Sequence, residues 1–126
     1  MKLSEKITVN DLLYVHQIAV EVHGGAHGIL NEGTLHYLTE KASHYSDPIL
    51  MSASLLHGIA TMHPFIDGNK RTAFASADMA LGIHGMRLFA SNTAAVSFTL
   101  SIARGEKTEE QVKVWIEKNS GMSPTY

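Results

Sequence analysis

The segment from His63 to Ala73, HPFIDGNKRTA, combines an imidazole, a carboxylate, a glycine, an amide and two cations within eleven residues. A neutral imidazole can accept a proton from a hydroxyl near physiological pH, which makes His63 a candidate general base. Lysine and arginine side chains bind phosphate oxygens, the first as a point charge and the second as a planar fork. These residue types together predict transfer of a phosphorus-centred group onto a hydroxyl, driven by positioning and charge stabilisation.

Four consecutive residues, Gly68, Asn69, Lys70 and Arg71, are the candidate phosphate-binding residues. A helix is expected to begin at Asn69, and the first N–H groups of a helix have no partner within it. Gly68 lets the backbone turn so that successive N–H groups point into one anion-binding concavity. Lys70 and Arg71 add full positive charges. Asn69 has two open interpretations, since it either only caps its helix or both caps it and binds phosphate.

Asp67 is the candidate metal ligand, because it lies beside this phosphate cradle. Mg²⁺ in proteins takes one or two carboxylates and completes its coordination with phosphate oxygens and water. Phe65 is expected to point into the core and support the loop. The segment is not a Walker A loop, because the spacing G-x-x-x-x-G-K-[ST] is absent.

The elements that must position this segment are predicted to be helices. Capping residues and glycines predict one all-α domain of about six helices over residues 1–126, with the active loop between the third and fourth helices. Residues 86–90 and 27–30 are candidates for short extended pieces, and residues 119–126 are expected to fray. The expected caps or first helical residues are Thr8, Asn31, Asp47 with Pro48, Asn69, Ser91 or Asn92, and Thr108.

The third expected helix, from about Pro48 to Met62, is apolar nearly all round and is therefore predicted to be central. The glycine-rich stretch from His23 to Gly33 has two open interpretations. It is a plain helix connection, or a mobile flap that docks a substrate segment through backbone pairing. The residues expected on the buried face of the first helix are Leu12, Val15, Ala19 and Val22.

Composition excludes several classes of protein. The chain is 44% hydrophobic and 17% charged with a net charge of −2, which is typical of a globular domain and argues against a general binder of DNA or anionic membranes. It has no cysteine, which excludes disulfides and thiolate metal sites. No apolar run is long enough to span a bilayer and no signal peptide is apparent, so a cytoplasmic protein is expected.

Histidines outside the motif are not expected to bind metal. His23 and His27 are four residues apart, but the two glycines between them are expected to end the helix that would bring them together. The remaining histidines are interpreted as surface residues or as core residues with satisfied hydrogen bonds; these are His16, His36, His44, His57 and His84.

The segment HPFIDGNKRTA resembles the Fic/Doc superfamily motif H-P-F-x-[DE]-G-N-[GK]-R, and more specifically its death-on-curing (Doc) branch, in which Lys replaces the second glycine. The stretch GGAHGILNEGTLHYL, residues 24–38, resembles an upstream element of that branch. The stretch SIARGEKTEEQV, residues 101–112, is similar to its C-terminal junction of two helices at a glycine. The resemblance covers nearly the whole chain, and the eleven-residue motif is its most specific part.

The resemblance implies an all-α Fic fold that uses ATP as substrate and Mg²⁺ as cofactor. Two positions depart from the pattern of AMP-transferring Fic proteins, since Lys70 replaces the second glycine and Phe74 stands where a second arginine is found. Family members with this lysine resemble protein kinases that bind the nucleotide in the reverse orientation and act as toxins by modifying a translation elongation factor. The implied roles are base for His63, Mg²⁺ ligand for Asp67, anion hole for Gly68 and Asn69, and phosphate binding for Lys70 and Arg71.

Three functions are therefore compared. The first is a toxin that phosphorylates a protein hydroxyl and is held inactive by a cognate antitoxin in trans, docked in a groove between the central helix and residues 23–33. An inhibitory [ST]-x-x-x-E-[GN] segment is absent from the chain, because Gly28 stands where Glu32-Gly33 would require Ser or Thr. The second is AMP transfer on the same scaffold. The third is a non-catalytic helical module that binds a nucleotide or a protein partner.

Overall fold

Six helices and a two-stranded ribbon make up the part of the chain that the computed structural model describes, residues 6–123. This arrangement confirms the predicted all-α domain of about six helices, with the loop of interest between the third and fourth helices. The elements in chain order are α1 (Val9–His23), α2 (Glu32–Ser43), α3 (Pro48–Met62), α4 (Asn69–Gly82), β1 (Met86–Leu88), α5 (Asn92–Ala103), α6 (Glu109–Lys118) and β2 (Ser120–Met122).

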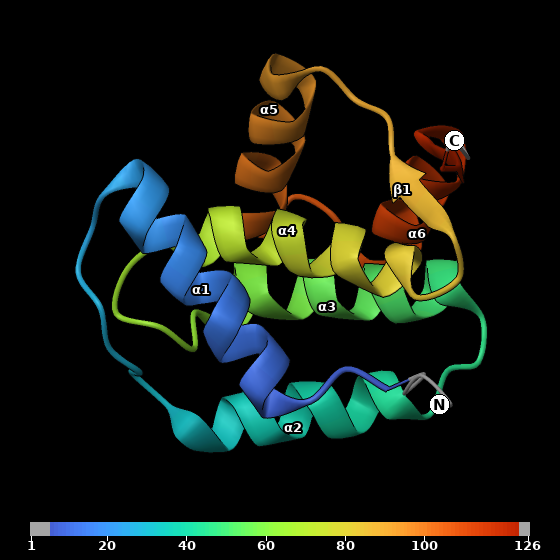
Figure 1. Ribbon diagram of the computed structural model, residues 1–126. Helices are drawn as coiled ribbons and strands as arrows, with labels where there is room; N and C mark the ends of the chain where they lie inside the picture. Colours follow the sequence, from blue (N-terminus) through green and yellow to red (C-terminus); the bar gives the residue numbers. More distant parts are fainter. Residues whose placement is uncertain (1–5, 124–126) are drawn as a thin grey trace.

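The third helix, α3, is the centre of the fold, as its sequence predicts. It packs against α2, α4, α5 and α6. Figure 1 shows α3 between α2 and α4, with α1 crossing in front of them. Small residues let α3 and α4 approach closely, and the Ser52 hydroxyl donates to the Ala77 carbonyl at 3.0 Å across their interface. The two ends that frame the active loop, the last turn of α3 and the first turn of α4, are thus held by the best-packed pair of helices.

Side-chain caps fix where the helices begin, with one exception. In each of the other five helices the N-cap side chain accepts a hydrogen bond from a backbone N–H of the first turn, which satisfies a donor that the helix itself leaves unpaired. The predicted caps Thr8, Asn31, Asp47, Ser91 and Thr108 are all confirmed. The exception is α4, where Gly68 is the N-cap and no side chain caps the helix.

The short strands β1 and β2 pair antiparallel, with Met86 opposite Met122 and Leu88 opposite Ser120. The expected extended piece at 86–90 is confirmed over the three residues of β1. The expectation that 119–126 frays is wrong for the β2 residues, because their backbone hydrogen bonds are made to β1. The Phe89 N–H also donates to the Asn119 carbonyl at 2.6 Å. Residues 124–126 lie outside the described part of the chain.

The buried face of α1 agrees with the expected one at Leu12 and Ala19, which are buried, and differs at Val15 and Val22. Val22 is 67% exposed, whereas His16 and Val20 are buried at 5% and 4%. The reason is the partner that α1 packs against. His16 and Val20 pack near Gly68 in the loop between α3 and α4, so the side of α1 that carries the polar His16 ring is buried and Val22 is left exposed.

No helix within residues 6–123 is long and apolar enough to cross a membrane.

Candidate active site

His63 ends α3 in an unusual backbone conformation. Its φ and ψ are 49° and 61°, the left-handed region, and it is the one non-glycine residue with positive φ among residues 6–123. Pro64 disfavours the right-handed helical conformation at His63, as the sequence predicts. Left-handed geometry costs a residue with a Cβ about 1–2 kcal/mol, and such strain clusters at functional sites. The exposed imidazole of His63 thus stands at the C-terminal end of α3 on a strained backbone.

Asn69 fixes the loop from the other side. Its side-chain Oδ1 accepts from the Phe65 N–H at 3.0 Å, and its Nδ2 donates to the Phe65 carbonyl at 2.8 Å. Phe65 is buried at 1%, as expected. The interpretation of Asn69 as a helix cap is wrong, because both polar atoms of its amide are used by Phe65 and Gly68 is the N-cap of α4. The Asn69 side chain therefore shapes the loop, and only its backbone N–H faces the start of the helix.

The glycine-rich segment after α1 lies along the loop as a short antiparallel bridge. The Ile66 N–H donates to the Gly28 carbonyl at 3.1 Å, and the Pro64 carbonyl accepts from the N–H groups of Leu30 and Asn31 at 2.8 and 3.0 Å. Ile29 and Phe65 are the paired residues of this bridge. Residues 28–31 thus connect α1 to α2, as expected for a helix connection, and also pair through the backbone with the active loop. The docking of a substrate segment on these residues stays a prediction.

The carboxylate of Asp67 is held by two backbone N–H groups. Oδ1 accepts from Gly68 at 3.0 Å and Oδ2 accepts from Ala26 at 3.1 Å. Gly25 has φ 112°, a conformation that favours glycine, and an added Cβ would stand 3.0 Å from Oδ2. A carboxylate offers about four lone-pair positions, so two hydrogen bonds leave room for a cation on this exposed side chain.

The donor set at Asp67 fits Mg²⁺ shared with a nucleotide. Within the described residues no group of three His, Cys, Asp or Glu side chains is placed to hold a metal ion by itself. Mg²⁺ usually keeps several waters and binds through one or two carboxylates plus substrate phosphates, and one carboxylate beside a phosphate cradle matches that mode. Asp67 is therefore the residue that would hold the ion.

The first turn of α4 forms the cradle. Gly68 has φ 75°, which turns the chain so that the following N–H groups point outward together. The N–H groups of Asn69, Lys70 and Arg71 make no hydrogen bond to any described residue. Both cationic side chains are exposed at this end of the helix. The combination of open N–H groups, the helix dipole and two full charges is suited to phosphate oxygens.

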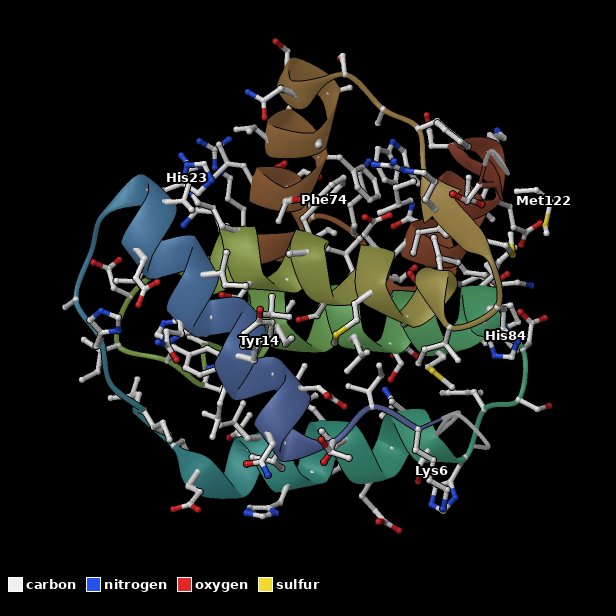
Figure 2. All side chains as sticks on the ribbon, in the orientation of Figure 1. Lys6, Tyr14, His23, Phe74, His84 and Met122 are labelled. Carbon is white, nitrogen blue, oxygen red and sulfur yellow. The ribbon has the colours of Figure 1, made fainter. Side chains whose placement is uncertain are left out.

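A cleft of about 650 Å³ extends from this cradle toward α5. Figure 2 shows two of its residues, with His23 at the end of α1 and Phe74 on α4 near α5. His63 is not among the lining residues. The cradle contributes Asp67, Gly68, Asn69, Lys70 and Arg71; α1 and α4 add His23, Gly24, Phe74 and Ala75; the far wall is Ala90, Asn92, Ala95, Val96 and Thr99. This far wall could not be predicted from the sequence, because its residues belong to no recognisable motif.

His16 is a core histidine with a satisfied hydrogen bond, one of the two expected alternatives, but its contact with the active loop is not predicted by the sequence. Its Nε2 lies 2.8 Å from the Asp67 carbonyl oxygen, and its ring stacks on Phe65 with centroids 3.8 Å apart and planes within 4°. The one signal in the sequence is its spacing, because His16 follows Leu12 by four residues and so shares a helix face with an apolar residue.

A smaller apolar groove of about 340 Å³ borders the cleft. Its lining residues are Val15, Ile18, Ala19, Val22 and His23 of α1 together with Arg71 and Ala75 of α4. The expected groove between the central helix and residues 23–33 stays a prediction, whereas this groove lies between α1 and α4. Two exposed apolar residues of α1, Ile18 and Val22, line this groove, and Arg71 is common to the groove and the cradle.

Residues 6–81, more than half of the chain, match the model of the Fic/DOC family. The chain belongs to the Fic/DOC family. No curated protein is similar enough to this Fic/DOC chain to count as a match. The matched region contains α1 to α4 with the whole active loop, whereas the α5 wall of the cleft lies beyond it. The protein is therefore a Fic-type transferase that acts on proteins with a nucleoside triphosphate and a metal ion.

Proposed function

We propose that this Fic/DOC protein transfers the γ-phosphate of ATP to a hydroxyl group of a protein, with Mg²⁺ as cofactor. The observation that carries the proposal is the position of His63 outside the cleft. The cleft runs from the cradle toward Phe74 and α5, whereas His63 is the C-cap of α3, at the other end of the loop sequence from the cradle, and is not a lining residue.

This arrangement favours one direction of nucleotide binding. A nucleoside needs the volume and the apolar lining that the cleft offers beside Phe74, Ala95 and Val96. With the nucleoside there, the phosphate chain runs across the cradle toward His63, and its terminal phosphate comes nearest to the base. AMP transfer would need the α-phosphate at that place instead.

The proposed reaction uses groups already described. The imidazole of His63 accepts the proton of the target hydroxyl, whose oxygen attacks the γ-phosphorus while the bond from that phosphorus to the β–γ bridging oxygen breaks. ADP leaves with the electron pair of that bond. The first N–H groups of α4 with Lys70 and Arg71 hold the phosphate oxygens in place. Mg²⁺ held by Asp67 and the nucleotide would neutralise charge on the leaving phosphates.

Two residues support phosphate transfer over AMP transfer. Lys70 brings a side chain and a charge to the start of α4, where a glycine would leave space. Phe74 lines the cleft where a second arginine would otherwise bind phosphate, so the deeper part of the cleft is apolar. An apolar wall suits a base or ribose better than a phosphate.

Radiolabelled ATP separates the candidate reactions. Purified protein is incubated with a cell lysate and with ATP labelled on either the γ- or the α-phosphate, in the presence of Mg²⁺. We expect label on a protein band from γ-labelled ATP alone. Label from α-labelled ATP alone would favour AMP transfer, and no label with retained ATP binding would favour a non-catalytic module.

Two variants at Lys70 sharpen this test. Lys70→Ala removes the charge, whereas Lys70→Gly also clears the Cβ. We expect both to lower γ-label transfer, and only the glycine variant can open the cradle to the opposite nucleotide orientation. Transfer of γ-label at the wild-type rate by both variants would remove Lys70 from the reaction.

The biological role that we propose is that of a toxin, with a translation elongation factor as target and a cognate antitoxin as partner. The groove beside the cradle supports the partner proposal. It presents Val15, Ile18 and Val22 from α1 and ends at Arg71, so an amphipathic helix of the antitoxin with an acidic residue near one end would cover both the apolar residues and a cradle cation.

Growth measurements test the role. Expression of this chain alone should arrest growth, and co-expression of the neighbouring open reading frame should relieve the arrest. Ile18→Asp in the groove should abolish the relief while leaving the arrest, because it places a charge against the partner's apolar face. Harmless expression of protein with verified transferase activity would contradict the toxin role.

A further inference from the structure

We propose that His16 is a positioning residue of the active loop, which locks the orientation of the peptide group between Asp67 and Gly68. The inference rests on the proposed phosphate cradle and concerns a residue outside the motif. His16 lies 51 positions from Asp67 in sequence, on α1, and does not line the cleft.

Three contacts connect this one ring to the loop. Nε2 is 2.8 Å from the Asp67 carbonyl oxygen, the ring stacks on Phe65, and Nε2 and Cδ2 lie 3.6 Å from where a Cβ on Gly68 would stand. A carbonyl oxygen only accepts, so the proton of this hydrogen bond is on Nε2. His16 is 5% exposed, so its donor side of the hydrogen bond is shielded from water.

The consequence follows from peptide geometry. In a trans peptide the C=O of one residue and the N–H of the next point in opposite directions within one plane. With the Asp67 carbonyl held toward α1, the Gly68 N–H must point away from α1. That N–H donates to Asp67 Oδ1 at 3.0 Å, so the same constraint orients the carboxylate that lies beside the cradle.

A lock is needed at this peptide. Gly68 has no Cβ and has φ 75°, so rotation of the 67–68 peptide meets little steric resistance on its glycine side. Reversing that peptide would turn the carbonyl toward the Asp67 carboxylate beside the cradle, where the two negative partial charges would repel and the carboxylate would lose a donor. The Asn69 amide holds Phe65 but does not contact the 67–68 peptide, and among the described residues His16 is the side chain that hydrogen-bonds its carbonyl.

Two substitutions separate the hydrogen bond from the packing. His16→Phe keeps a ring that can stack on Phe65 but has no donor. His16→Gln loses the ring but places an amide N–H at nearly the same distance from Cα as Nε2. His36→Phe is the matched control, because His36 is an exposed histidine on α2 without any contact to the loop.

The experiment measures pyrophosphate binding to the ¹⁵N-labelled full chain through the amide signal of Gly68. We expect His16→Phe to shift that signal in the free protein and to weaken binding about tenfold, the typical effect of losing one buried hydrogen bond. His16→Gln should bind within about threefold of wild type. His36→Phe should leave both the Gly68 signal and the affinity unchanged.

Several outcomes would overturn the inference. These are wild-type affinity in His16→Phe, an affinity of His16→Gln no better than that of His16→Phe, or no pyrophosphate binding by the wild type. If His16→Phe does not fold, His16→Met takes its place as the variant of similar length to Gln without a donor. Pyrophosphate binding requires no turnover, so failure of the proposed phosphate transfer would leave this result intact and the two failures are distinguishable.

Discussion

Asn69 and Phe65 are joined by a pair of hydrogen bonds in which one side-chain amide satisfies both backbone polar groups of a buried residue. The loop can therefore place Phe65 in the core without leaving its N–H and C=O unpaired, a cost that is large in a dry environment. The first residue of α4 thereby determines the shape of the chain that precedes it.

Asn69→Asp is expected to destabilise the protein by about 1–3 kcal/mol, since the Phe65 carbonyl would lose its donor and face a carboxylate. The free energy of unfolding in urea measures this effect. Asn92→Asp, at the exposed start of α5, is the control with the same chemical change, and it should shift the free energy of unfolding by less than about 0.5 kcal/mol. Equal effects of the two changes would contradict the role given to Asn69.

His63→Asn is expected to lower transfer by on the order of 10²–10⁴ while leaving nucleotide affinity nearly unchanged. Asn is preferred to Ala for this test because it tolerates left-handed geometry, so the imidazole is removed with little change in the loop. Single-turnover rates and nucleotide titrations measure the two effects. His44→Asn, at the exposed end of α2, is the control, and unimpaired turnover in His63→Asn would exclude His63 as the base.

Asp67→Asn is expected to weaken Mg²⁺-dependent nucleotide binding and activity together, because the amide keeps the shape but loses the charge. Nucleotide titrations with and without Mg²⁺ measure the change, and the two affinities should become similar in the variant. Asp78→Asn is the matched control, since Asp78 also accepts a backbone N–H, that of Leu88 at 2.8 Å, but lies outside the cleft lining. An unchanged Mg²⁺ effect in Asp67→Asn would make Asp67 a purely structural residue.

The ion pair between Lys41 of α2 and Glu109 of α6 makes the free energy of unfolding depend on pH in the alkaline range. Burial opposes the charge of Lys41, but its 2.7 Å hydrogen bond to Glu109 and the charge of that carboxylate outweigh burial, so the pKa of Lys41 is raised above its ordinary 10.5. Because the pKa of Lys41 is raised in the folded state, the contribution of this ion pair to the free energy of unfolding is fully present below the unfolded-state pKa. It is lost as pH rises through the folded-state pKa.

Wild-type protein should therefore lose about 0.5 kcal/mol relative to Lys41→Met as pH rises above about 10.5, a small value because both side chains are one-third exposed. Urea unfolding of the two proteins over this range measures the difference. Lys113→Met, which removes longer contacts of 3.6 and 3.8 Å on α6, should show less pH dependence. If the free energies of unfolding of the wild type and of Lys41→Met changed equally with pH, the raised pKa would not belong to Lys41.

Local patterns in the sequence predicted the helices and the motif loop well, because caps and glycines act on their immediate neighbours. Thr8, Asp47 and Thr108 begin their helices where their side chains indicate. The contact of His16 with Asp67 and the α5 wall of the cleft could not be predicted in this way. Each depends on how helices that are distant in sequence pack together. A histidine on an apolar helix face needs a hydrogen-bond partner such as the Asp67 carbonyl, and the sequence of the helix does not show whether one is there.

The backbone pairing between residues 28–31 and the active loop has a consequence for hydrogen exchange. The N–H groups of Leu30, Asn31 and Ile66 and that of Ala26 are all bonded across the same two segments, so separation of these segments exposes all four amides in one event. The four should exchange at a common rate, faster than the amides of α3, which open only when the helices come apart. A common rate would make the active loop and residues 26–31 one cooperative unit, which opens and closes while the helical bundle stays folded.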